Sequence, residues 1–181
     1  GHDGSVIGVD MLPEMLARAE NATEKVAEKL GWNNLDFRQG YLEDLPVEAA
    51  SVDVVISNCV INLSPHKRRV FGEILRVLKP GGKLVISDVT SEGQIPIAIK
   101  CDAKLRGECL GGAIQQDRLF QLLSDVGFRN ALMLNRFPYR NVQGHQFHSI
   151  TYAAVKPDGG EGREVLYRGP FAAVITDDGS L

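Results

Sequence analysis

Two of the three cysteines lie in contexts that are unusual for a buried structural thiol. Cys59 directly follows a β-branched run that ends in Asn58, and Cys109 lies between glycines in the segment 107–112. Glycines on both sides of a thiol permit close backbone approach and unusual backbone angles. Thiolates are the soft donors that a thiophilic ion prefers, so the two thiols could form one ligand site. The alternative is that each is a small buried hydrophobic residue, while Cys101 is expected on a helix face.

Further candidates for ligand binding lie at the predicted end of an early strand and in a later loop. Asp10 ends the apolar run 5–10, where a carboxylate can accept hydrogen bonds from both ribose hydroxyls of a nucleotide. The side chain of Met11 could lie against an adenine face, and the loop that holds Leu42 and Glu43 could recognise the adenine ring. The alternatives are a capping or loop acid at Asp10, a packing methionine, and an ordinary acidic turn.

Apolar periodicity predicts that alternating strands and helices position these residues. Strands are predicted at 5–10, 35–38, 51–57 and 83–88, and helices at 13–30, 65–79 and 115–126. Two β-rich segments, 130–137 and 146–156, follow the last helix. Strands that alternate with helices indicate an α/β fold with a parallel sheet, and two successive β-rich segments indicate an antiparallel closing pair.

Local signals refine this prediction. The run 51–57 is nearly continuous in β-branched residues, so we expect a strand buried on both faces. Ser64 is expected to cap the second helix, and the basic run 67–69 is expected to form its solvated face.

Composition excludes several classes of protein. The chain has 181 residues, of which 44% are apolar and 24% charged, which is typical of a single globular domain. The net charge of −3 shows no basic surplus for nucleic-acid binding. No apolar run approaches the ~18 residues of a membrane span, and no signal peptide is visible. Three cysteines without a secretion signal predict reduced thiols in the cytoplasm.

Three segments together resemble the class I S-adenosylmethionine-dependent methyltransferases. They are Val-Ile-Gly-Val-Asp-Met at 6–11, Val-Asp-Val-Val-Ile-Ser-Asn at 52–58, and Leu-Arg-Val-Leu-Lys-Pro-Gly-Gly at 75–82. The resemblance implies a Rossmann-like sheet, mostly parallel with an antiparallel closing strand. It also implies S-adenosyl-L-methionine as the cofactor.

A finer resemblance is to the arsenite methyltransferases. It rests on Ser-Asn-Cys-Val-Ile-Asn-Leu-Ser at 57–64, Ser-Asp-Val at 87–89 and Gly-Glu-Cys-Leu-Gly-Gly-Ala at 107–113. The resemblance implies that Cys59 and Cys109 are the catalytic thiolates that bind As(III), supplied as arsenite or methylarsenite, and that a thiol reductant takes part. It also implies five cofactor-binding residues: Asp10 at the ribose, Met11, Leu42 and Glu43 at the adenine, and Asn58 beside the methionine part.

The chain departs from the family pattern at both ends. Members of the family carry a first strand and a glycine-rich loop before the strand that opens this sequence, and a further cysteine in that region. We therefore expect a methyltransferase domain at 1–156 that lacks this strand and loop, followed at 157–181 by the start of a C-terminal extension. The loss of a central strand would leave sheet edges unpaired.

Two other functions stay open on the sequence alone. One is a methyltransferase for a small organic acceptor such as a quinone, which would have an apolar acceptor pocket and would be indifferent to thiol reagents. The other is a non-catalytic thiol module that binds arsenic without methyl transfer.

Overall fold

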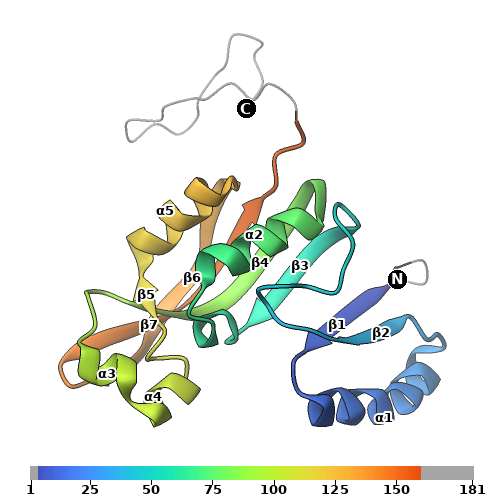
Figure 1. The fold of residues 1–181 in the computed structure, drawn as a ribbon, viewed down its shortest axis with the longest axis horizontal. Helices are drawn as coiled ribbons and strands as arrows, with labels where there is room; N and C mark the ends of the chain where they lie inside the picture. Colours follow the sequence, from blue (N-terminus) through green and yellow to red (C-terminus); the bar gives the residue numbers. More distant parts are fainter. Residues whose placement is uncertain (1–3, 160–181) are drawn as a thin grey trace.

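The computed structural model describes residues 4–159, and its elements alternate along the chain. Figure 1 shows them in order: β1 (Val6–Asp10), α1 (Pro13–Leu30), β2 (Leu35–Gln39), β3 (Val52–Asn58), η1 (Ile61–Leu63), α2 (Lys67–Val77), β4 (Leu78–Ser91), α3 (Ile97–Cys101), α4 (Ala103–Gly107), β5 (Ile114–Gln115), α5 (Gln116–Val126), β6 (Arg129–Val142) and β7 (His145–Val155). Most of the proposed extension, residues 160–181, lies outside the described residues.

The strands form two separate sheets. β1 and β2 pair in parallel as a two-stranded sheet, and the larger sheet has the order β3-β4-β7-β6 with β5 added beside β4. The β3–β4 and β4–β5 pairs are parallel, whereas β7 is antiparallel to both β4 and β6. The predicted α/β fold, mostly parallel with antiparallel closing strands, is therefore confirmed.

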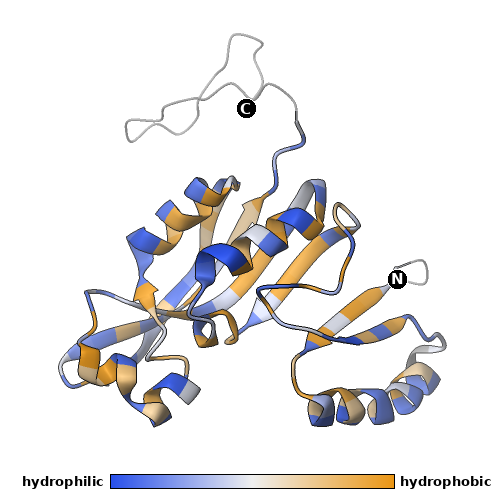
Figure 2. Ribbon diagram, in the orientation of Figure 1, coloured by the Kyte–Doolittle hydropathy of each residue, from blue (hydrophilic) through white to orange (hydrophobic). Residues whose placement is uncertain are grey.

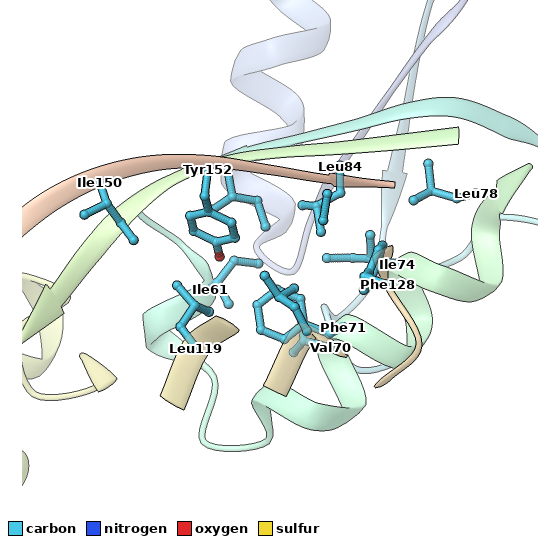
Figure 3. Packing of buried hydrophobic residues seen from close by; sticks show 13 residues of the cluster. Ile61, Val70, Phe71, Ile74, Leu78, Leu84, Leu119, Phe128, Ile150 and Tyr152 are labelled. Atoms are coloured by element: carbon cyan, nitrogen blue, oxygen red, sulfur yellow. The ribbon is translucent and has the colours of Figure 1, made fainter. Parts of the chain in front are cut away.

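The main core lies between the larger sheet and the helices α2 and α5, which cover one of its faces (Figure 1). The apolar stripe of α2 packs against side chains that project from β4 and β7, as Figure 3 shows for Phe71, Leu84 and Tyr152. This burial fixes β4 and the turn that precedes α2 relative to one another. Both contribute residues to the candidate site below.

The expectation that β3 is buried on both faces is wrong. Val55 packs against the main core, but Val54 is 52% exposed and Ile56 is 77% exposed. Because side chains alternate along a strand, these two residues share the opposite face. In Figure 2, β3 is the strand of the larger sheet nearest β1, and most of it has the hydrophobic colour.

The second helix is shorter than its predicted range of 65–79. It begins at Lys67, and the hydroxyl of Ser64 accepts a hydrogen bond from the backbone N–H of His66 (3.0 Å) just before the helix rather than capping it. It ends at Val77 because Pro80 disfavours helical geometry at the preceding residue, and β4 starts at once.

The glycine stops predicted for the first and last helices are confirmed. Gly31 and Gly127 follow α1 and α5 with φ of 79° and 118°, in the left-handed conformation that glycine adopts without strain. Within the described part of the chain, no helix has the length and apolar character needed to cross a membrane.

Candidate active site

The fold brings Cys59 and Cys109 together across 50 positions of sequence. Cys59 follows β3, and its N–H donates a hydrogen bond to the carbonyl of Ser87 in β4 (2.9 Å). Cys109 lies in the segment between α4 and β5, and its thiol donates to the carbonyl oxygen of Cys59 (Sγ···O 2.8 Å). Cys59 is exposed, whereas Cys109 is buried at 5% exposure. The predicted pairing of the two segments is therefore present in the structure.

Both cysteines have left-handed backbone angles. The φ values are 54° at Cys59 and 63° at Cys109. For a residue other than glycine this conformation costs about 1 kcal/mol or more. It persists where the surrounding structure fixes it, and such residues concentrate at functional sites. The glycines around Cys109 were the sequence signal for unusual backbone geometry in this segment.

Both thiols are protonated near neutral pH. Burial raises the pKa of Cys109 to about 11, assisted by the carboxylate of Asp88 and by Cys59. Partial burial and Asp88 also raise the pKa of Cys59. Since the thiolate is the form that binds a soft ion, each thiol must lose its proton when it binds one.

A buried acid and a half-buried lysine lie behind the two thiols. Asp88, near the carboxyl end of β4, is 4% exposed. Burial raises the pKa of Asp88, and this effect outweighs the backbone N–H hydrogen bonds, which lower it. Burial lowers the pKa of Lys67, while Asp88 and Cys109 act in the opposite direction. Lys67 donates to the carbonyl of Ser64 (3.0 Å).

The prediction of a solvated basic face at 67–69 is therefore wrong for Lys67, although Arg68 and Arg69 are exposed. Sequence reasoning also missed the position of Asp88. The acid ends the predicted strand 83–88, which pairs with the strand that leads to Cys59, and this position was the available signal.

The residues expected at the ribose and the adenine face lie at the end of β1. One oxygen of the Asp10 carboxylate accepts from the N–H of Leu12 (2.9 Å), which is the local turn of the alternative interpretation. A carboxylate has about four acceptor positions, so this bond leaves capacity for ribose hydroxyls. Met11 is 51% exposed, and its carbonyl accepts from Gln39 (3.2 Å).

The other residues expected at the cofactor have different surroundings. The carboxylate of Glu43 accepts a hydrogen bond from the hydroxyl of Ser64, which ties the loop after β2 to the start of α2. Leu42 packs against the main core. Leu42 and Asn58 both line a cavity of about 830 Å³ between the β1–β2 pair and β3, whereas Asp10, Met11 and Glu43 do not line it.

Comparison with known proteins finds a family and individual relatives that are similar in sequence. The model of the methyltransferase domain family matches residues 1–127. An arsenite methyltransferase from Aquipseudomonas alcaligenes is 41% identical over 93% of this chain and 54% of its own length. A second, from Halobacterium salinarum, is 46% identical over 71% of this chain and 32% of its own length.

A solved structure shares both the fold and the sequence. It is an arsenic(III) S-adenosylmethionine methyltransferase from Chlamydomonas reinhardtii, with a TM-score of 0.81 and 39% identity over 88% of this chain and 57% of that one. The chain thus spans about half the length of this structure and of the relative from Aquipseudomonas alcaligenes. Because the family model matches residues 1–127 of a chain of 181 residues, the chain belongs to the methyltransferase domain family.

Proposed function

We propose that the chain serves the S-adenosylmethionine-dependent methylation of trivalent arsenic, held by the thiolates of Cys59 and Cys109. The observation that carries this proposal is the hydrogen bond from the Cys109 thiol to the Cys59 carbonyl, which brings the two thiol-bearing segments into contact. The similarity to arsenite methyltransferases supports the choice of substrate.

The two thiols exchange oxygen ligands of arsenic for sulfur. Each arsenic–hydroxide bond breaks as an arsenic–sulfur bond forms, and the thiol proton leaves with the hydroxide as water. Two exchanges on arsenous acid leave one hydroxide on the arsenic and release two water molecules. The redox state of arsenic is unchanged, and the lone pair of trivalent arsenic remains available.

In the proposal, the Asp10 carboxylate binds the ribose hydroxyls of S-adenosylmethionine. Met11, Leu42 and Glu43 lie at the adenine, and Asn58 lies at the methionine part. When bound, this group supplies an electrophilic methyl on a sulfonium sulfur. The protein's part is to hold the arsenic lone pair in line with that methyl, and such positioning supplies roughly 7–11 kcal/mol of barrier reduction in favourable cases. Methylation through the lone pair oxidises arsenic by two electrons, so the proposal includes a thiol reductant.

The proposal also covers the organisation and location of the protein. Residues 1–156 form the methyltransferase domain, and 157–181 begin a C-terminal extension. All three cysteines of the described residues are free thiols, and the chemistry requires Cys59 and Cys109 to be reduced, which fits the cytoplasm.

Titration calorimetry with arsenite under reducing conditions, with and without S-adenosylmethionine, tests the proposal. Loss of either thiol removes the second, intramolecular bond, so Cys59→Ser and Cys109→Ser should each weaken binding by about a hundredfold or more. Cys101→Ser is the matched control, because Cys101 is exposed on α3, and it should leave the affinity unchanged.

Each remaining outcome has a defined meaning. Arsenite binding that survives both substitutions would contradict the thiolate site. Cofactor binding without arsenite binding would favour an organic acceptor such as a quinone. Arsenite binding without cofactor binding, in a chain that methylates nothing, would favour a thiol module without catalysis.

A further inference from the structure

The two cysteines belong to two segments that lie against each other over more than the thiols. The first is the turn 59–63 after β3, and the second is the segment 107–113, which we call the glycine loop. Asn62, in the turn, is buried at 7% exposure, and no role in the proposed chemistry accounts for it so far. A buried amide needs its hydrogen bonds satisfied, and its partners indicate what it does.

Asn62 is fixed to β4 at three points. Its backbone N–H donates to one oxygen of Asp88 (3.1 Å), and its side-chain amide donates to the other oxygen (2.8 Å) and to the carbonyl of Val89 (2.7 Å). Hydrogen bonds to a carboxylate are roughly twice as strong as neutral ones. The turn that starts with Cys59 is therefore attached to the end of a core strand.

The glycine loop reaches Asn62 through Gly112. A Cβ added to Gly112 would overlap the carbonyl oxygen of Asn62 and would lie 2.9 Å from its carbonyl carbon. The φ of Gly112 is not in the left-handed region, so space rather than backbone conformation excludes a side chain there. Gly107, at the other end of the same loop, has no atom within 4 Å of an added Cβ.

We propose that Asn62 is a positioning residue that sets the separation of Cys59 and Cys109. Asp88 fixes Asn62 on β4, and the glycine loop packs against Asn62 through Gly112. The inference rests on the proposed function, because it concerns the pair of thiols that would share one arsenic. It assigns separate roles: the cysteines bind the ligand, and the Asp88–Asn62–Gly112 contact holds the two segments that carry them against each other.

The geometry supports an effect on the thiol pair in particular. Cys109 is three residues from Gly112 in the sequence and donates to the carbonyl of Cys59, which is itself three residues from Asn62. A methyl group at Gly112 must push the loop away from the turn, and the push acts directly on the two segments that carry the sulfurs. A misplacement of about 1 Å can cost about a hundredfold where two groups must act together.

The test compares Gly112→Ala with Gly107→Ala, in the 181-residue chain carrying Cys101→Ser so that two thiols remain. The probe is phenylarsine oxide, which binds one arsenic to a pair of thiols. We expect Gly112→Ala to weaken the binding of phenylarsine oxide by about tenfold or more. Gly107→Ala should bind it as tightly as the parent does. The charge-transfer absorption of the arsenic–sulfur bonds should fall in the same variant.

A second reaction separates thiol spacing from thiol access. Iodoacetamide alkylates each thiol singly, so both thiols of Gly112→Ala should still react at least as readily as those of the parent. Circular dichroism and the thermal midpoint show whether each variant is folded. Asn62→Ala gives an independent variant, because it removes the two side-chain hydrogen bonds but leaves the backbone bond to Asp88, and it should lower the affinity for phenylarsine oxide in the same direction.

The outcomes for the two proposals are distinct. If the parent binds phenylarsine oxide through both thiols and either folded variant binds it equally well, the positioning role of Asn62 is overturned while the proposed function stands. If the parent does not bind it through Cys59 and Cys109, the proposed function itself is wrong.

Discussion

The two halves of the candidate site differ in how firmly the fold holds them. The thiol half lies beside the larger sheet, where Cys109, Asn62 and Asp88 are all buried. Asn62 donates hydrogen bonds to Asp88, and the Cys109 thiol donates to the carbonyl of Cys59. Four of the five expected cofactor residues lie at or after the ends of β1 and β2, a two-stranded sheet covered by α1, whereas Asn58 ends β3. Two-stranded sheets are marginal alone, because they bury little apolar surface. The comparison teaches that the thiol half is assembled by the core, whereas Asp10 and Met11, at the end of β1, depend on contacts within the small two-stranded sheet and its adjoining turn.

The largest effect on stability should come from a cavity in the main core, next to the thiol half. Phe71 of α2 is fully buried in the main cluster, so Phe71→Ala should lower the free energy of unfolding by about 3–5 kcal/mol. Val6→Ala in β1 is the counterpart. Because Val6 is 53% exposed, this substitution should lower the free energy of unfolding by less than about 1 kcal/mol. Urea denaturation measures both. Equal losses would show that the two halves are equally well packed.

Hydrogen exchange should resolve the same difference residue by residue. Backbone amides in β1, α1 and β2 should exchange about a hundredfold or more faster than those in β4 and β7, because local opening is easiest where few apolar side chains are buried. Native-state exchange followed by mass spectrometry measures this. Matching protection across both sheets would contradict the comparison.

The thiol half should also respond to alkaline pH. Below about pH 9 the Cys109 thiol is protonated in both the folded and the unfolded chain, so its contribution to stability is fully present. Between the unfolded value of 9.0 and the folded value of about 11, the unfolded chain releases the proton and the folded chain retains it, so stability falls as pH rises. Denaturation at a series of pH values measures this decline, and it should be smaller in Cys109→Ser.

The smallest effect is expected at a surface ion pair that belongs to neither half. Lys79 contacts Asp53 at 2.9 Å, but the side chain of Asp53 is 79% exposed and that of Lys79 is 45% exposed. Such pairs contribute about 0–1 kcal/mol, and salt screens them. Asp53→Asn should therefore leave both the thermal midpoint and arsenite binding within error. A larger shift would mean that the start of β3 couples to the site.

Much of the fold could be predicted because its signals are local. The helix α1 has the predicted bounds, since Pro13 suits its first turn and Gly31 its end. The exposure of Ile56 could not be predicted from a β-branched run, because such a run shows what a strand would bury and not which neighbours are present. The length of α2 differed because the chain turns directly into β4 at Leu78.

The sequence predicted which two segments of the candidate site come together, but it did not predict the residues that support them. Glycines beside Cys109 and the strand end before Cys59 indicated two thiols at one edge, and the structure brings these segments together. Asn62 gave no such signal, because one asparagine in an apolar segment does not reveal a carboxylate partner 26 positions away. The close contact between Gly112 and Asn62 likewise joins segments that are distant in the sequence, so it could not be predicted either.

The unequal exposure of the two thiols sets an order of events. A thiophilic ligand arriving from solvent meets the exposed Cys59 first, while Cys109 is covered and its hydrogen is engaged by the Cys59 carbonyl. Capture would then be quick and weak, and closure onto the second sulfur slower, because that hydrogen bond must break first. Arsenic uptake would follow two kinetic phases, and the reagent concentration would accelerate only the first.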